Sequence, residues 1–173
     1  MHAEVVKSVL AVAKVIREEI TRLELEIPPD EGLPAKGQMI MSRALTKGTP
    51  FYVVRIAEQI NSSYENGTFD ACAVMMRRLI ETLLLAAFEY HGLDAKIKDP
   101  TGEFFQLGPI IQLALAEKWN LSRNTKRALP TLKDLGDKSA HSRRFLAHRD
   151  DIDRVRDGFR TAVQELIAIA GLK

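Results

Sequence analysis

Apolar residues recur at steps of three and four along most of this chain, the spacing that places side chains on one face of an α-helix. The longest such stretch runs from Thr68 to His91. Leu85 and Ala86 are also apolar but lie outside the main apolar face of this helix. We therefore predict that neighbouring helices contact it on several sides. The positions expected to be buried are Phe69, Cys72, Ala73, Met76, Leu79, Ile80, Leu83, Leu84, Ala87 and Phe88.

The same periodicity predicts helices before and after this central one. An amphipathic helix is expected at about residues 3–26, and it should end before Pro28 because proline disfavours helix at the residue that precedes it. We expect this first helix to pack on the rest of the domain or on a second copy of the chain. The remaining helices are predicted at residues 38–47, 50–66, 108–119, 122–141 and 150–173.

Three features between these helices carry more specific predictions. Pro130 is expected to kink or restart the helix that contains it. Gly136, in the same helix, indicates close approach of a neighbouring helix. Residues 93–107 should form a loop that Phe104 and Phe105 pin to the core.

Together these elements predict an all-α fold of six to seven helices, in a single domain that spans residues 1–173. The composition is 46% hydrophobic and 28% charged, as in an ordinary globular protein, and only 6% aromatic. Cys72 is the only cysteine, so no internal disulfide can form, which suits a reducing compartment. Lys7 and Lys14 interrupt the first apolar stretch, which argues against a secretory signal, and no apolar run is long enough to cross a bilayer. We therefore predict a cytoplasmic protein without a membrane partner.

The net charge of +2 conceals a local excess of positive charge. Between residues 122 and 149 there are eight lysines and arginines against two aspartates, so the rest of the chain is mildly acidic. Such a basic segment is typical of a surface that binds an anionic partner, most simply phosphate groups. A solvated helix face is the alternative interpretation. The basic residues are Arg123, Lys126, Arg127, Lys133, Lys138, Arg143, Arg144 and Arg149.

Candidate chemistry is confined to the same segment. The sequence has no glycine-rich phosphate loop, no GxSxG, no HExxH and no Cys/His cluster at zinc spacing, which disfavours metal and cofactor enzymes. His141 and His148 lie among arginines. Imidazoles exchange protons near neutrality, and guanidinium groups hold phosphate oxygens in a planar fork. This combination suits cleavage of RNA without a metal, with histidine as acid or base and arginine stabilising the charge on phosphate.

The chain also resembles a known family. An apolar helix FDACAVMMRRLIETLL, a later helix ending in LGDKSAH and a terminal amphipathic helix are similar to HEPN-type helical domains, in particular to an uncharacterised bacterial branch with the approximate signature Arg-x-x-Gly-Asn-x-Ala-Ala-His. The resemblance covers roughly residues 50–170. It implies a compact helical bundle, commonly dimeric. Many HEPN domains are metal-independent ribonucleases of toxin, defence or stress systems, using an arginine and a histidine four to six residues apart, often assembled across the dimer.

Two alignments with this family stay open. In the first, Arg143 and His148 have the spacing of the nuclease motif. The resemblance then implies that these two residues are catalytic. The residue after the arginine, usually asparagine, aspartate or histidine in the family, is Arg144 in this chain.

In the second alignment, His141 is the histidine of the bacterial branch. Asp137 then stands where asparagine is usual, and Lys133 stands where arginine is usual. Lysine keeps the positive charge but lacks the planar fork of arginine, so it stabilises a phosphate transition state less well.

The central helix contributes three further polar candidates, Arg77, Arg78 and Glu81. Arg77 and Glu81 are four residues apart, so one interpretation is a surface ion pair. The other is that an arginine leans toward the histidine segment while Glu81 orients an imidazole. The other residues expected to contact phosphate or nucleic acid are Arg144, Lys133, Lys138 and Arg149.

Two functions from different classes therefore remain. The first is a HEPN-like effector that binds or cleaves RNA, without cofactor or metal. The second is a catalytically inactive HEPN-like module that dimerises or docks onto a partner protein. An imidazole within hydrogen-bond reach of an arginine in an open groove favours the first, and imidazoles sealed by backbone contacts favour the second.

Overall fold

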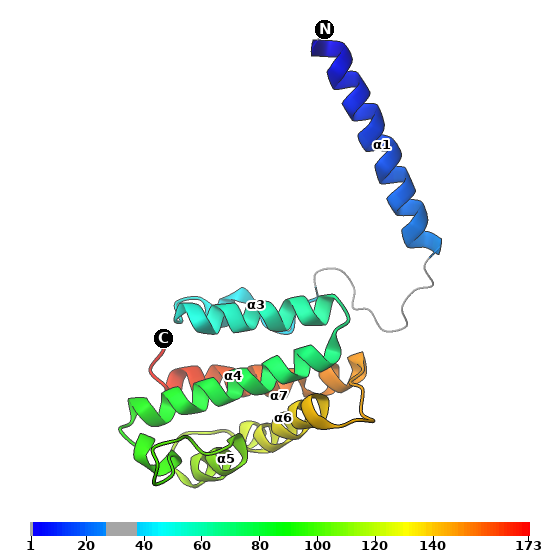
Figure 1. The fold of residues 1–173 in the computed structure, drawn as a ribbon. Helices are drawn as coiled ribbons and strands as arrows, with labels where there is room; N and C mark the ends of the chain where they lie inside the picture. The colour runs from blue at the N-terminus through cyan, green and yellow to red at the C-terminus, as the bar shows by residue number, and fades with distance from the viewer. Residues whose placement is uncertain (1, 27–37) are drawn as a thin grey trace. The chain divides into compact units, whose positions relative to one another are not determined.

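The computed structural model of the chain describes residues 2–26 and 38–173, and the side chains of residues 6–19 and 38–173. The chain divides into two compact units, Met1–Leu33 and Pro34–Lys173. The first contains the helix α1 (His2–Glu26), which agrees with the helix predicted at residues 3–26 (Figure 1). Its packing on the second unit or on another copy stays a prediction.

The second unit contains all the other helices. The described residues form seven α-helices and one 3-10 turn, with no strand, so the predicted all-α fold of six to seven helices is confirmed. The elements of the second unit are α2 (Arg43–Thr46), α3 (Phe51–Glu65), α4 (Phe69–Tyr90), the 3-10 turn η1 (Asp94–Ile97), α5 (Leu107–Ala116), α6 (Arg123–His141) and α7 (Arg149–Ile169).

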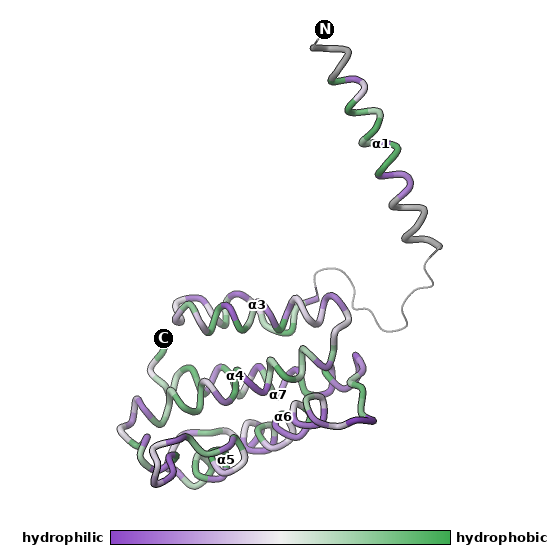
Figure 2. The backbone as a smooth tube through the Cα atoms, viewed as in Figure 1, coloured by the Kyte–Doolittle hydropathy of each residue, from purple (hydrophilic) through white to green (hydrophobic). Residues whose placement is uncertain are grey.

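The helix α4 is the centre of the second unit. It contacts α3, α5, α6, α7 and η1, and Figure 1 shows it running between α3 and the pair α6 and α7. Nine of its residues are buried, including Cys72, Met76 and Leu83. Phe69, Leu85 and Ala86 are half-buried, so apolar contacts extend around the helix as predicted. Hydrophobic and hydrophilic residues alternate along the surrounding helices (Figure 2), as amphipathic helices around a core require.

The helix α6 excludes one of the two effects predicted for Pro130. The helix is not restarted there but runs continuously from Arg123 to His141 with the proline inside it. Proline removes one backbone donor and frees the carbonyl of residue 126. Pro130 and Lys126 are both exposed, so water can satisfy that carbonyl and the helix continues.

The loop predicted at residues 93–107 also differs in detail. It begins with η1, whose Ile97 is fully buried, and Phe105 packs against the core. Phe104 is exposed instead, with the Lys98 ammonium 5.0 Å from its ring centroid. Ile97 and Phe105 therefore pin the loop to the core. The backbones of Lys98 and Phe104 form an isolated antiparallel bridge. Since neighbouring side chains in an extended segment alternate, the Phe104 ring points away from the core.

We expect the buried thiol of Cys72 to be unreactive in the folded protein. Cys72 is fully buried in α4, and burial raises the pKa of its thiol to about 12. The reactive thiolate is therefore scarce at neutral pH. Iodoacetamide at about pH 8 should leave the native protein unmodified and should label it fully in guanidinium chloride, as mass spectrometry can measure. Rapid labelling of the native protein would contradict the central position of α4.

Candidate functional site

The helices α4 and α6 approach each other closely at Gly136. A Cβ atom added at Gly136 would lie 2.5 Å from the Cβ and 2.9 Å from the Cδ of Arg77. Real side chains do not tolerate such distances, so only glycine allows α6 to lie this close to the arginine. The close approach predicted from Gly136 is confirmed.

Four charged side chains form an ion network at this crossing. The Arg77 Nε donates to Asp137 Oδ1 at 2.6 Å, and its Nη1 donates to Glu81 Oε2 at 3.2 Å. Lys133 Nζ donates to the second oxygen of Asp137, Oδ2. Asp137 thus joins one cation from each helix, and Glu81 orients the Arg77 guanidinium rather than an imidazole. We call these four residues the crossing network.

The crossing network is partly shielded from water. The side chains of Arg77, Glu81 and Asp137 are 25%, 29% and 30% exposed. Partial burial opposes ionisation of Asp137, but its hydrogen bonds to Lys133 and Arg77, together with their charges, outweigh this and lower the pKa of the carboxyl below its ordinary value. Asp137 is therefore a carboxylate at neutral pH, and it neutralises much of the charge of Lys133.

His141 is the last residue of α6, one turn beyond Asp137. Lys133, Asp137 and His141 are each four residues apart, so they follow one side of the helix. The His141 side chain is exposed, and it makes no hydrogen bond or ion pair with any residue that the structure describes. Its imidazole is thus accessible to a ligand beside the crossing network.

Arg143 and Arg144 are exposed in the connection between α6 and α7. The hydroxyl of Ser142 accepts hydrogen bonds from the backbone N–H groups of Phe145 at 3.2 Å and Arg144 at 3.4 Å. At its far end the connection is fastened to α4, because the N–H of Ala147 donates to Asp70 Oδ1 at 3.0 Å. The backbone is held at both ends while the two guanidinium groups face water.

His148 precedes the first residue of α7 and is also exposed. Its backbone N–H donates to Asp151 Oδ2 at 3.0 Å, which caps the helix. Neither His141 nor His148 is hydrogen-bonded to Arg143 or Arg144. The His141 imidazole is therefore open to solvent, whereas the His148 side chain takes part in a capping box with the backbone of Asp151.

The other predicted site residues lie in different parts of the second unit and have different ion partners. Arg77, Glu81 and Lys133 meet in the crossing network, and Lys138 pairs with Asp134 at 2.8 Å on the exposed side of α6. Arg78 is exposed and makes no ion pair among the described residues. Arg149 lies in a separate cluster with α3.

That cluster was not predicted from the sequence. The Tyr64 hydroxyl donates to Asp153 Oδ1 at 2.6 Å, and Arg149 Nε lies 3.3 Å from Asp153 Oδ2. Burial and the bond to Asp153 raise the pKa of the Tyr64 phenol. Arg149 also donates to Gln38 Oε1 at 2.9 Å. Arg149 thus connects α7 to the segment before α2. Because its guanidinium already contacts Asp153 and Gln38, these contacts do not support the prediction that Arg149 binds phosphate.

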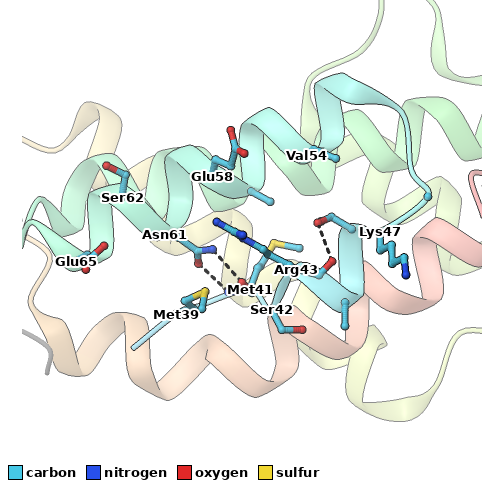
Figure 3. A pocket seen from close by; sticks show the side chains of 14 residues that line it. Met39, Met41, Ser42, Arg43, Lys47, Val54, Glu58, Asn61, Ser62 and Glu65 are labelled. Atoms are coloured by element: carbon cyan, nitrogen blue, oxygen red, sulfur yellow. Dashed lines mark hydrogen bonds between the residues drawn. The ribbon is translucent and has the colours of Figure 1, made fainter. Parts of the chain in front are cut away.

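A hollow of about 840 Å³ lies between α2 and α3. The Asn61 side chain closes one wall, accepting from the N–H of Met41 and donating to its carbonyl, both at 2.9 Å (Figure 3). Met39, Arg43 and Glu58 also line it, and no residue predicted for the site does so. The sequence contains no signal for this hollow, because its lining residues form no motif.

Comparison of the chain with protein-family models, with curated proteins and with solved structures gives no match. Within the described residues, no group of three or more His, Cys, Asp or Glu side chains is arranged to hold a metal ion. No helix in the described part of the chain has both the length and the hydropathy to cross a bilayer.

We expect Asp137→Ala to destabilise the protein by about 1–3 kcal/mol, because it leaves Arg77 without its α6 partner in a partly buried position. Asp134→Ala, which removes only an exposed pair with Lys138, is the matched control and should change the free energy of unfolding by less than about 0.5 kcal/mol. Urea unfolding at pH 7 measures both. Equal losses would contradict the role assigned to the crossing network.

The pH dependence follows from the same carboxyl. Its pKa is lower in the folded chain than the value of about 3.9 in the unfolded chain. The stabilisation by Asp137 is therefore present above about pH 4 and is lost as the pH falls through the folded pKa. The difference in stability between parent and Asp137→Ala should shrink in this acidic range.

Proposed function

We propose that this protein is a HEPN-like helical domain that acts on RNA through the solvent-facing side of α6 and the connection from α6 to α7. The observation that supports this best is a group of exposed cations without ion partners among the described residues. Their charge is available to an anionic ligand because no carboxylate of the described chain neutralises it. The cations are Arg123, Lys126, Arg127, Arg143 and Arg144.

Helical geometry supports one continuous basic surface. Arg123, Arg127, Lys138 and His141 fall on the side of α6 opposite its buried residues, which include Leu129 and Leu132. The connection then adds Arg143 and Arg144. Lysine and arginine in such a row bind the phosphates of a nucleic acid chain largely by releasing condensed counterions.

For catalysis, the first alignment with the family fits the charges better. Lys133 is already engaged by Asp137, so it is poorly suited to stabilise a phosphate transition state. Arg143 has no such partner among the described residues. In the proposed reaction an imidazole removes the proton of a 2′-hydroxyl, and the 2′-oxygen attacks the adjacent phosphorus. The 5′-oxygen leaves with a proton from the second imidazole, and Arg143 stabilises the charge on the phosphoryl oxygens.

The catalytically inactive module is the second candidate. It is favoured by the absence of a hydrogen bond between either imidazole and Arg143 or Arg144, and by the closed crossing network at Asp137. In this alternative the domain dimerises or docks onto a partner protein, and the basic surface has a structural or regulatory role.

Dimerisation is a further part of the proposal, and α1 supports it. Six of its apolar side chains are 53–64% exposed within the described residues: Val6, Val9, Leu10, Val12, Val15 and Ile16. The sequence continues Val6 and Val9 with Ala13, Ile16, Ile20 and Leu23, an alternation of three and four that is typical of a coiled-coil seam. We propose that a second copy of α1 covers this stripe.

To test catalysis, we expect the purified protein to cleave total RNA in EDTA. His141→Ala and His148→Ala should each slow cleavage by about 100-fold or more if both imidazoles transfer protons. The appearance of 2′,3′-cyclic phosphate ends measures the reaction. Full activity in both variants, or a requirement for added magnesium, would contradict the mechanism. RNA binding without cleavage would indicate an RNA-binding effector, and the absence of both binding and cleavage would favour the inactive module.

To test dimerisation, we expect light scattering to give twice the mass of the chain at tens of micromolar. Ile16→Glu should yield a monomer, because it introduces charge into the apolar stripe. Lys7→Glu, which lies outside the stripe, is the control and should leave the dimer intact. A parent protein that is monomeric at this concentration would refute the role of α1.

A further inference from the structure

A second hollow, of about 310 Å³, lies between α6 and α7. Its floor contains Ala128 and Gly158, where a Cβ added to the glycine would lie 3.0 Å from the Cβ of Ala128. Two small residues facing each other leave a shallow depression rather than a ridge. The polar residues around the floor are Asn124, Arg127 and Thr131 from α6, and Arg154, Asp157 and Thr161 from α7.

Four of the six polar side chains at this hollow are available to a ligand, whereas the hydroxyls of Thr131 and Thr161 donate to carbonyls of their own helices at 3.2 and 2.9 Å. Asn124 and Arg127 make no side-chain hydrogen bond or ion pair with any described residue, and they lie three residues apart on one side of α6. Arg154 is 75% exposed and pairs only loosely with Asp151, at 3.6 Å. The Asp157 side chain is 94% exposed, and its nearest cation, Arg160, lies 3.8 Å away.

We infer that this hollow holds one nucleotide of a bound RNA strand, an inference that rests on the proposed function. The guanidinium groups of Arg127 and Arg154 match the phosphate, because each offers paired donors in a planar fork. The Asn124 amide has the donor and acceptor that a base edge requires. The Asp157 carboxylate accepts a hydrogen bond from a 2′-hydroxyl, the group that distinguishes RNA from DNA.

The size and position of the hollow fit this ligand. A volume near 300 Å³ is at the lower end for small-molecule sites, which suits a single nucleotide. Arg127 and His141 are fourteen residues apart in α6, or about 21 Å along the helix axis. A strand of several nucleotides can therefore occupy the hollow and also reach the histidines along one side of α6.

The test uses the full chain with His141→Ala and His148→Ala, so that RNA is not cleaved, and a fluorescent ten-nucleotide RNA whose binding is followed by anisotropy. Asn124→Ala should raise Kd by about five- to tenfold without changing the dependence of Kd on salt, because no charge is removed. Asn120→Ala is the matched control, since Asn120 is exposed just before α6, outside the hollow.

Arg127→Gln should raise Kd and reduce the slope of log Kd against log salt by about 0.7, the value for one phosphate contact in a single strand. Lys118→Gln, an exposed cation outside the hollow, should change Kd by less than about twofold. Asp157→Asn should reduce the preference for RNA over DNA of the same sequence.

The outcomes separate this inference from the proposed function. If the hollow variants match their controls while Arg143→Gln and Arg144→Gln weaken binding, the hollow is not a nucleotide site, although the protein still acts on RNA. If the parent chain with intact histidines binds no RNA, both proposals are refuted.

Discussion

The approach of α6 to α4 at Gly136 is the constraint on which the rest of the second unit depends. Without a Cβ at this position, the helices come close enough for Arg77 to reach Asp137. That contact holds the C-terminal half of α6 against the most buried helix of the unit. Since His141 ends α6, the same crossing determines where its imidazole emerges from the fold.

The start of α7 is held by a second set of long-range contacts. Asp70 fastens the residue before His148 to the first turn of α4, and Tyr64 of α3 bonds Asp153 in α7. Arg160 of α7 donates to the carbonyls of Met39 and Ile40 at 2.7 and 2.6 Å. The bonds from Ala147 to Asp70 and from Tyr64 to Asp153 hold the end of the basic connection that leads into α7, while Arg143 and Arg144 stay exposed. A ligand that binds there meets a backbone whose ends are already positioned, which lowers the entropy cost of binding.

The helices were predictable because apolar spacing reports burial directly. Nine of the ten positions expected to be buried in α4 are buried in the structure, and the tenth, Phe69, is half-buried. Gly136 was also informative, since glycine inside a helix costs stability unless a neighbour requires it. Of the two effects predicted for Pro130, the restart is wrong, because helix continuation past a proline depends on whether the freed carbonyl reaches water, which a sequence does not reveal.

The candidate site was predictable only in part. Arg77 and Asp137 are 60 residues apart, and Tyr64 and Asp153 are 89 apart, so nothing local indicates either contact. The sequence therefore grouped Arg149 with the phosphate-binding residues, whereas its contacts lie with Gln38 and Asp153. The hollow between α6 and α7 was missed because Ala128 and Gly158 are unremarkable until two helices bring them together.

Hydrogen–deuterium exchange with and without RNA tests the central claim most directly, namely that the ligand binds along α6 and the connection to α7. Added RNA should slow exchange in peptides covering residues 123–128 and 141–149, because bound RNA excludes water and restrains the backbone there. Peptides from α3 should not change. Protection confined to α2 and α3, with none in α6 or the connection, would contradict this account.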